Sequence, residues 1–362
     1  MYSVLDIIPD GPLLSPVQAK QLDDEFFLAR PLPYFSAKIA SLLKVEKSPS
    51  APDPENFQEF YGALGMPSTS QILDYEVGDR QLQVSVDALA LRHHAAEALI
   101  RFLHAVTVAK QRPGDAPSTW VAIADGPQSL FDVAKQLRAV ADSDEHAFWH
   151  AFIKTGVNNT AEIHEAFATA CGWVDRAIQL LTDDELTINA AHNKVKHGLA
   201  ISVRNDVRIE FLRGNPPENG TIPLSSFQNG NSIPLFDRPM LSYLARPHGK
   251  PRQGLEITSL QVDLPIVLAE TRMIAVVYAA CFHVAALAHF GVADTIAPYP
   301  VLHKGPTPEQ LLGHALQGYR ATVTMPPDGK TPPRPSGLFF PGVFQSMVID
   351  FENITQAVVV DG

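Results

Sequence analysis

Apolar side chains recur every three or four residues along a long run of the chain, from Leu82 to Lys110. This spacing is typical of an α-helix that buries one face, and the run Gln111 to Gly114, which contains Pro113, ends it. Further segments with helical spacing lie between Ser129 and Leu199, and short connections join them. Because short connections favour antiparallel neighbours, the pattern predicts a helical bundle.

Three of these later helices are expected to begin at capping boxes. In such a box a short polar side chain caps the first turn, and a glutamate three residues later bonds back to it. The expected pairs are Asp142 with Glu145, Asn159 with Glu162, and Thr182 with Glu185. The last pair would open a helix that runs to His197.

After Gly198 the apolar period changes from helical spacing to two. Ala200 to Leu212 and Leu255 to Val262 alternate as strands or hairpin arms do, and a loop rich in Gly, Pro and Asn separates them. Asp263 and Pro265 then open a long apolar helix that ends at Gly291. The β-containing segment is therefore predicted to be an insertion, at about 200–263, between two helices of one bundle.

The two ends of the chain differ from this bundle. Residues 1–80 are interrupted by prolines and are predicted to wrap over the bundle as short helices, at Val17 to Leu28 and Tyr34 to Leu43. The tail is predicted to contain a short helix opened by Thr307 and Gln310, a proline-rich loop, and strands at Val343 to Phe351 and Thr355 to Val360. The fold class expected is mainly α, with parts at 1–80, 81–291 (the bundle with its β insertion) and 292–362 (a mixed C-terminal tail).

The run Met273 to Phe290 is long and apolar enough to be weighed as a membrane span. Glu270 and Arg272 precede it closely, and His283 lies within it. We interpret it as a helix buried on all sides in the bundle, and we expect no membrane contact.

The composition is that of an ordinary globular protein, with 46% hydrophobic and 19% charged residues. A net charge of -11 argues against a protein that coats nucleic acid, but it leaves room for a local basic groove. The two cysteines, Cys171 and Cys281, lie far apart in apolar sequence and are expected to be buried free thiols. The chain shows no secretion signal pattern at its N-terminus, so a cytoplasmic location is expected.

The richest chemistry lies in residues 188–199, which read INAAHNKVKHGL. On a helix, Asn189, Asn193, Lys196 and His197 share one side, and His192 lies on the adjoining face. His197 would occupy the last turn, where the negative end of the helix favours a protonated imidazole by roughly 0.3 to 1 kcal/mol. Such a group suits proton donation to a leaving oxygen, or contact with a phosphate.

Cations gather in and just after this motif, in contrast to the acidic chain as a whole. Asp206 and Glu210 oppose them, which leaves a local excess of positive charge suited to phosphate contacts. The cations are Lys194, Lys196, Arg204, Arg208 and Arg213.

A polar stripe on the helix from Leu82 to Lys110 supplies supporting candidates. His93, Glu97 and His104 fall within a narrow angular window, and Arg92 lies elsewhere around the helix. One interpretation is that this stripe lines a functional cleft, and the other is a solvated face with an i, i+4 pair.

The run His192 to His197, HNKVKH, resembles the signature of HEPN domains, which are helical bundles that include many metal-independent ribonucleases. Their signature is an arginine, a polar residue, a short spacer and a histidine. Asn193 matches the polar position and His197 the histidine, whereas His192 stands where the family has arginine. The run RHHAAE, Arg92 to Glu97, is similar to an earlier helix of some HEPN-like proteins, and the resemblance covers at most residues 81–199.

The resemblance implies a homodimer that cleaves or binds RNA without a metal or cofactor. The ribose 2′-hydroxyl would attack the adjacent phosphate, with His197 as general acid or base, Asn193 positioning groups and a cation stabilising the phosphorane. His192 is a weaker cation than arginine because a guanidinium is always charged and grips phosphate with two donors.

Three alternatives stay open. The chain could be a non-catalytic HEPN-like interaction module, since the family contains inactive members. It could bind a metal such as zinc through His93 and Glu97 with His94, His192 or His197. Finally, Asn189, Asn193 and His197 could tie the helix end to the next strand without any catalysis.

Overall fold

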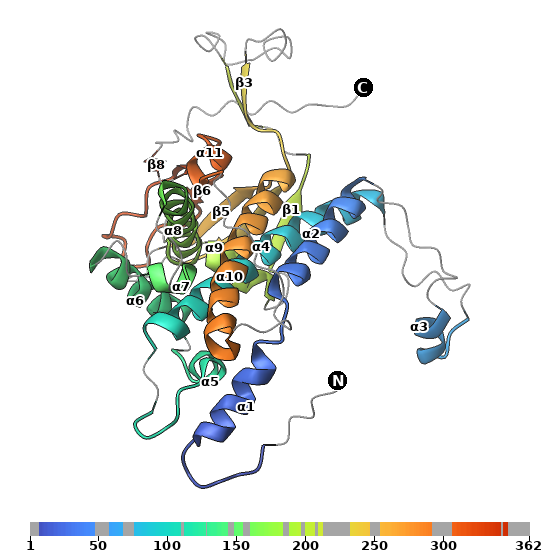
Figure 1. Cartoon of the computed structure of the whole chain (residues 1–362). Helices are drawn as coiled ribbons and strands as arrows, with labels where there is room; N and C mark the ends of the chain where they lie inside the picture. Colours follow the sequence, from blue (N-terminus) through green and yellow to red (C-terminus); the bar gives the residue numbers. More distant parts are fainter. Residues whose placement is uncertain are drawn as a thin grey trace, which may run out of the picture. The chain divides into compact units, whose positions relative to one another are not determined.

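The computed structural model of the chain describes a mainly α-helical protein with an antiparallel sheet, which confirms the predicted fold class (Figure 1). The residues described are 7–47, 58–67, 76–109, 112–127, 129–143, 148–154, 160–183, 188–196, 200–206, 209–212, 232–246, 254–291, 306–341 and 343–346. They divide into two compact units. A helical unit comprises residues 1–44, 87–192 and 265–313, and a sheet unit comprises residues 45–86, 193–264 and 314–362. Each unit thus combines parts of the chain that the sequence pattern assigned separately.

Helices account for most of the described chain, and those predicted by periodicity are present. They are α1 (Pro16–Phe26), α2 (Pro31–Lys47), α3 (Gln58–Ala63), α4 (Val77–Thr107), α5 (Thr119–Ala124), α6 (Leu130–Ser143), α7 (Trp149–Phe152), α8 (Ala161–Thr182), α9 (Ile188–Lys196), α10 (Leu264–Phe290) and α11 (Pro308–Leu312). The run that begins at Leu82 forms α4, which starts five residues earlier than its apolar pattern and ends at Thr107.

The core of the helical unit forms where α4, α8 and α10 meet. Phe102 of α4 packs on Tyr278 and Phe282 of α10, with ring centroids 5.5 and 5.4 Å apart. Trp173 of α8 is fully buried, and its indole N–H donates to the Pro306 carbonyl at 2.9 Å. Among the described residues, α10 alone is long and apolar enough to cross a membrane by composition, and 67% of its most apolar window is buried. Its aromatic contacts to α4 are those of a bundle's central helix.

All three predicted capping boxes before α7, α8 and α9 are wrong in detail. Asp142 lies in the last turn of α6, and α7 follows Phe148, whose side chain makes no capping bond. Thr160, one residue beyond the expected Asn159, caps α8 by accepting from the Ile163 N–H. Thr182 ends α8 and donates its hydroxyl to the Ile178 carbonyl at 2.8 Å. The same short polar side chains can cap a helix or bond back to its last turn, and sequence alone does not separate the two.

The capping box before α11 is confirmed. Thr307 accepts from the Gln310 N–H at 3.3 Å, and the Gln310 side chain accepts from the Thr307 N–H at 3.0 Å. Pro308 sits in the first turn, where its missing N–H costs nothing. The residue order Thr-Pro-x-Gln therefore predicted this helix start correctly.

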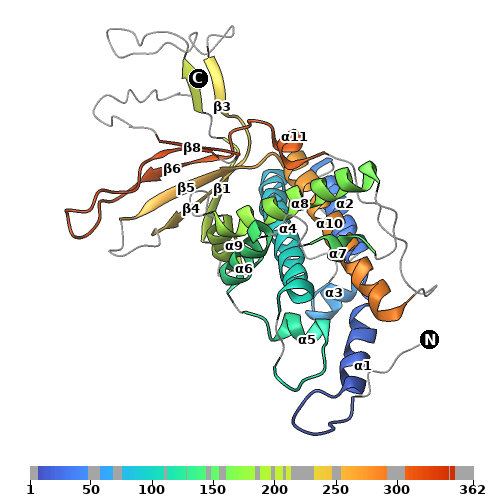
Figure 2. The ribbon, with the colours of Figure 1, turned by 60° about the vertical axis from the view of Figure 1, so that its left-hand side comes forward.

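In the described part of the sheet unit, six antiparallel strands pair in the order β1-β4-β5-β6-β7-β8, and several of them are seen side by side in Figure 2. They are β1 (Ile201–Arg204), β4 (Met240–Ala245), β5 (Glu256–Gln261), β6 (Gly318–Thr322), β7 (Gly337–Phe340) and β8 (Val343–Ser346). A separate ribbon pairs β2 (Ile209–Leu212) with β3 (Ser232–Phe236). The predicted strand Ala200 to Leu212 is therefore two strands in different sheets.

One sheet is formed jointly by the predicted insertion, at about 200–263, and the predicted tail, at 292–362. β5 belongs to the insertion and β6 to the tail, and they pair directly, with Ser259 opposite Tyr319. The backbones approach closely at Gly318, where an added Cβ would lie 2.2 Å from the Ser259 carbonyl oxygen. The strand β8 begins where predicted, whereas its predicted extension to Phe351 and the strand Thr355 to Val360 lie outside the described residues.

The sheet unit buries its own charged cluster. Arg320 of β6 is buried and lies over the rings of Phe339 and Phe344, at 5.5 and 4.6 Å from the ring centroids. Its guanidinium donates to the Pro335 carbonyl at 3.0 Å and lies 3.8 Å from the buried Glu256 carboxylate. The proline-rich loop thus supplies a carbonyl that helps to fix Arg320 between β5 and β7.

Candidate functional site

Two histidines from distant parts of the chain stack face to face in the helical unit. The rings of His93 on α4 and His192 on α9 have centroids 3.9 Å apart and planes only 7° from parallel. His93 is 2% exposed, whereas His192 is partly exposed. The first histidine of the HNKVKH motif therefore contacts the polar stripe of α4, while the residue as a whole stays partly exposed.

A carboxylate and a guanidinium lie next to this pair on α4. Glu97 Oε2 is 4.0 Å from His93 Nδ1, and Arg101 Nε donates to Glu97 Oε1 at 2.7 Å. Burial by itself would raise the pKa of Glu97, but the hydrogen bond and charge of Arg101, together with His93 and His192, lower the pKa below its usual value of 4.5. Glu97 is therefore ionised at neutral pH, beside a guanidinium that is 27% exposed.

Arg92, a supporting candidate, belongs to a different cluster in the bundle core. Its Nη1 donates to Glu270 Oε2 at 2.6 Å, and Arg176 Nε of α8 donates to Glu270 Oε1 at 2.7 Å. Burial would raise the pKa of Glu270, but the two guanidiniums hold it below 4.5. Arg92 Nε and Arg176 Nη2 are buried without a hydrogen-bond partner in the described structure. Arg92 is thus tied to the core, and it does not contribute to a cleft at the motif.

The interpretation of the α4 stripe as a solvated face is wrong. His93 and His104 are both buried, and His104 Nε2 lies 2.9 Å from the Gln136 side-chain oxygen on α6. His94 is the exposed histidine of this helix, and its ring contacts Tyr34 and Phe35 at 5.8 and 5.5 Å. The polar stripe therefore faces α6 and α9, because the bundle buries the side of α4 that carries it.

The residues of the HNKVKH motif that follow His192 belong to the sheet unit. Within α9, Asn193 and Lys196 are exposed and Lys194 is half-buried. His197, the predicted general acid or base, lies outside the described residues. The described end of the motif is therefore a short helix segment whose Asn193 and Lys196 side chains are exposed.

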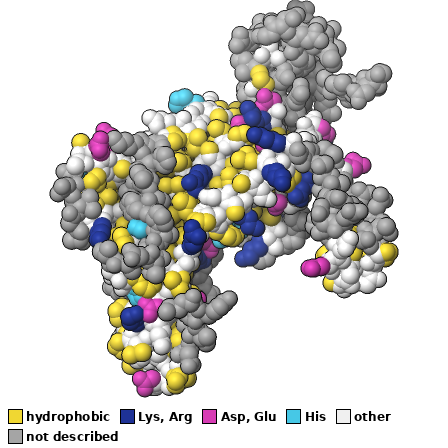
Figure 3. Space-filling view, turned by 45° about the vertical axis from the view of Figure 1, so that its right-hand side comes forward, with side chains coloured by type: hydrophobic (Ala, Val, Ile, Leu, Met, Phe, Trp, Pro, Cys, Tyr) yellow, Lys and Arg dark blue, Asp and Glu magenta, His cyan; other side chains and the backbone are white. Residues whose placement is uncertain are grey.

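The predicted basic patch is only partly described. Arg204 forms a two-point ion pair with Asp206, at 2.8 and 2.7 Å, so its charge is locally balanced. Arg208 lies outside the described residues, as does Arg213. Figure 3 shows Lys and Arg side chains among hydrophobic ones on the face that it presents. The cations that are both described and accessible in the motif are Lys194 and Lys196.

Sequence reasoning missed Arg101, Arg176 and Glu270 as members of these clusters. The signal for Arg101 was its i, i+4 spacing from Glu97. The signal for Glu270 was a single carboxylate in the first turns of an all-round apolar helix, since a buried charge requires a partner. The signal for Arg176 was likewise a charged residue among the buried apolar positions of α8, such as Trp173 and Ala177.

Within the described ranges, no group of three His, Cys, Asp or Glu side chains could hold a metal ion. The arrangement offers the partly exposed His192 as a candidate for proton transfer, with Glu97 and Arg101 as charged neighbours of its stacked partner His93. No family model, curated protein or solved structure matches the chain. Function is therefore inferred from the residues of the chain itself.

Proposed function

We propose that the chain acts on RNA through the end of α9, as a metal-independent endoribonuclease that resembles HEPN domains. The observation that carries this proposal is the stack of His192 on His93 beside the Glu97 carboxylate. It joins the HNKVKH motif to the RHHAAE run, the two segments on which the resemblance rests. A partly exposed imidazole near a fixed carboxylate and guanidinium is suited to proton transfer and phosphate contact.

The proposed reaction needs only groups that the chain supplies. A base removes the proton of the ribose 2′-hydroxyl, the oxygen attacks the adjacent phosphorus, and the 5′-oxygen leaves with a proton from an acid. The products are a 2′,3′-cyclic phosphate and a free 5′-hydroxyl. His197 and His192 would serve as the acid–base pair, and Asn193 and Lys196 would position the phosphate.

Replacement of the predicted histidines tests the proposal. Purified protein should cut a mixed-sequence RNA in the presence of EDTA, and His197→Ala should lower the rate by about 10²- to 10⁴-fold, the usual contribution of a general acid or base. The melting temperature should stay unchanged. His94→Ala, at an exposed position of α4 away from the stack, is the matched control and should cut at the wild-type rate.

RNA that stays intact across a broad panel of substrates, or cleavage that His197→Ala leaves unchanged, would contradict the proposal. Analysis of the cut ends gives an independent measurement. A 3′-phosphate without a cyclic intermediate would exclude attack by the 2′-hydroxyl and hence this mechanism.

A second candidate function is a non-catalytic HEPN-like interaction module that forms a homodimer. The observation in its favour is that Glu97 already bonds to Arg101 and that His93 is almost completely buried. Such a cluster can serve to hold α9 on α4 without any reaction. Light scattering distinguishes this candidate, since it requires a dimer of the purified chain together with RNA that remains uncut.

A further inference from the structure

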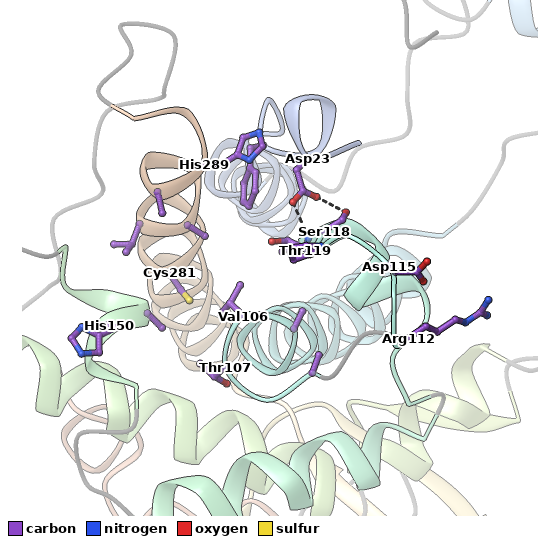
Figure 4. Close-up of a pocket in the computed structure, with 18 residues that line it drawn as sticks. Asp23, Val106, Thr107, Arg112, Asp115, Ser118, Thr119, His150, Cys281 and His289 are labelled. Carbon is purple, nitrogen blue, oxygen red and sulfur yellow. Dashed lines mark hydrogen bonds between the residues drawn. The ribbon is translucent and has the colours of Figure 1, made fainter. Parts of the chain in front are cut away.

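A cavity of about 960 Å³ opens in the helical unit (Figure 4). Neither histidine of the stack lines it. The ends of α4 and α10 form its floor, and α1, α7 and the start of α5 form its walls. Alanines at the facing positions leave the space unfilled; they are Ala105, Ala109, Ala151, Ala285 and Ala288. Its volume lies within the range of sites that bind small molecules, which is roughly 300 to 1,000 Å³.

A fixed carboxylate lies in the wall of this cavity. Asp23 of α1 is only 6% exposed, and its Oδ1 accepts hydrogen bonds from the Ser118 hydroxyl at 2.8 Å and the Trp120 N–H at 3.0 Å. Its Oδ2 accepts one bond, from the Thr119 N–H at 2.8 Å, so this oxygen has capacity for another donor. These bonds, two of which Figure 4 draws, hold the carboxylate in place before any ligand arrives.

The charge balance of the lining favours a cation. Asp115 adds a second, half-buried carboxylate, which accepts from the Leu14 N–H at 2.7 Å. The lining arginine, Arg112, is 77% exposed, points away from the cavity in Figure 4 and lies 3.8 Å from Asp125. The lining His289 likewise lies next to Asp24, at 2.8 Å, whereas the hydroxyl and backbone N–H groups that donate to Asp23 are neutral. The net charge of -11 on the whole chain also draws cations toward the protein.

The rest of the lining combines aromatic and apolar side chains with polar ones, among which are Thr107, His150 and His289. Phe27 is buried beside Asp23, and its ring centroid is 5.3 Å from that of His289. Burial raises the pKa of the Cys281 thiol, so this side chain stays protonated and acts as an apolar wall. A carboxylate next to aromatic faces is a common setting for an organic cation, because both the charge and the ring quadrupole attract it.

We propose that this cavity binds a small organic ammonium compound. The ammonium group donates a hydrogen bond to Asp23 Oδ2, and the apolar body lies against Phe27 and the alanines of α4 and α10. This inference is independent of the action on RNA, because it involves none of the residues of the histidine stack.

Three probes of similar size and different charge test the inference on the full chain by titration calorimetry. They are 2-phenylethylammonium chloride, 2-phenylethanol and 3-phenylpropionate. We expect the ammonium compound to bind at least about tenfold more tightly than the other two, which corresponds to about 1.4 kcal/mol. Binding of the carboxylate at equal affinity, or no heat from the ammonium compound, would overturn the proposal.

Variants locate the binding in the cavity. Asp23→Asn keeps a side-chain oxygen to cap α5 and removes the charge, so the ammonium compound should bind no more tightly than the alcohol. Ala285→Phe fills the cavity and should remove binding of the ammonium compound. Asp132→Asn, at an exposed position of α6 outside the lining, is the matched control and should leave all affinities unchanged. If Asp23→Asn still binds the ammonium compound more tightly than the alcohol, the proposal is wrong. If one of the two variants fails to fold, the other variant and the probe series on the wild-type chain decide.

Discussion

Both units bury a glutamate near two arginines, but the two carboxylates are held differently. In the helical unit Glu270 receives direct hydrogen bonds from Arg92 and Arg176, at 2.6 and 2.7 Å. In the sheet unit Glu256 Oε2 lies 3.8 Å from Arg320 Nε, and Glu256 Oε1 lies 3.9 Å from Arg334 Nη1.

The difference lies in what else holds each arginine. Arg320 has the Pro335 carbonyl and two aromatic rings, so Glu256 is one of several groups that stabilise its charge. Arg92 and Arg176 depend on Glu270, which is the carboxylate that both share. Burial of a charge costs several kcal/mol unless partners compensate for it, so the same residue types should differ widely in their contribution to stability.

The largest expected effect is that of Glu270→Gln. The change leaves two buried guanidiniums without a negative partner, so we expect the free energy of unfolding to fall by about 3 to 5 kcal/mol. Urea unfolding followed by circular dichroism measures this loss. In the triple variant Arg92→Met, Glu270→Leu, Arg176→Leu, most of the stability should return, because apolar side chains of similar volume need no charged partner. A triple variant as unstable as Glu270→Gln would contradict this account.

The pH dependence of unfolding tests how much the ionised Glu270 carboxylate contributes to stability. The pKa of Glu270 is lower in the folded chain than its ordinary value of 4.5, so its contribution is fully present above that value and is lost as the pH falls through the folded pKa. Unfolding at a series of pH values below about 5 should show a steeper loss in the wild type than in the triple variant. Equal slopes would mean that other carboxylates govern acid unfolding.

A smaller effect is expected of Glu256→Gln. Arg320 keeps its carbonyl and its aromatic contacts, so the loss should be about 1 to 3 kcal/mol, the usual cost of removing one buried polar partner. The same urea experiment measures it. A loss equal to that of Glu270→Gln would show that the carbonyl and the rings contribute little to Arg320.

The smallest effect is expected of Glu97→Gln. Its ion pair with Arg101 is an i, i+4 pair that is partly open to solvent, so the loss should be about 0.3 to 0.5 kcal/mol. If the proposed action on RNA is correct, this variant should change cleavage far more than it changes the melting temperature. A change in melting temperature with no change in cleavage would favour a purely structural role for Glu97.

Local patterns predicted the helices well and the sheet poorly. The spacing of apolar residues located α4 and α10, and the residue order at Thr307 located the start of α11. The strands β4, β6 and β7 were not predicted, because they are short, and the pairing of β6 with β5 is not local. The strand β6, for example, pairs with β5 across α10 and the residues that follow it. Strand pairing of this kind leaves little trace in the sequence around either strand.

The candidate site was also predicted only in part, because its two segments meet through a contact between distant parts of the chain. The motif on α9 and the stripe on α4 were both visible as residue types at helical spacing. Their meeting through His192 and His93 is a tertiary contact that neither segment encodes alone. Arg92 was grouped with the stripe by its sequence position, yet its side chain turns to Glu270, because successive residues on a helix point about 100° apart.

The pairing of β5 with β6 also sets an order of events during synthesis. When β1, β4 and β5 have left the ribosome, β5 presents an open edge, and its partner β6 is not made until all of α10 has followed. An exposed strand edge is a template for pairing with another chain. The interval needed to translate residues 262–317 is therefore a period in which the nascent chain is vulnerable to aggregation, and slowing translation there should lower the yield of folded protein.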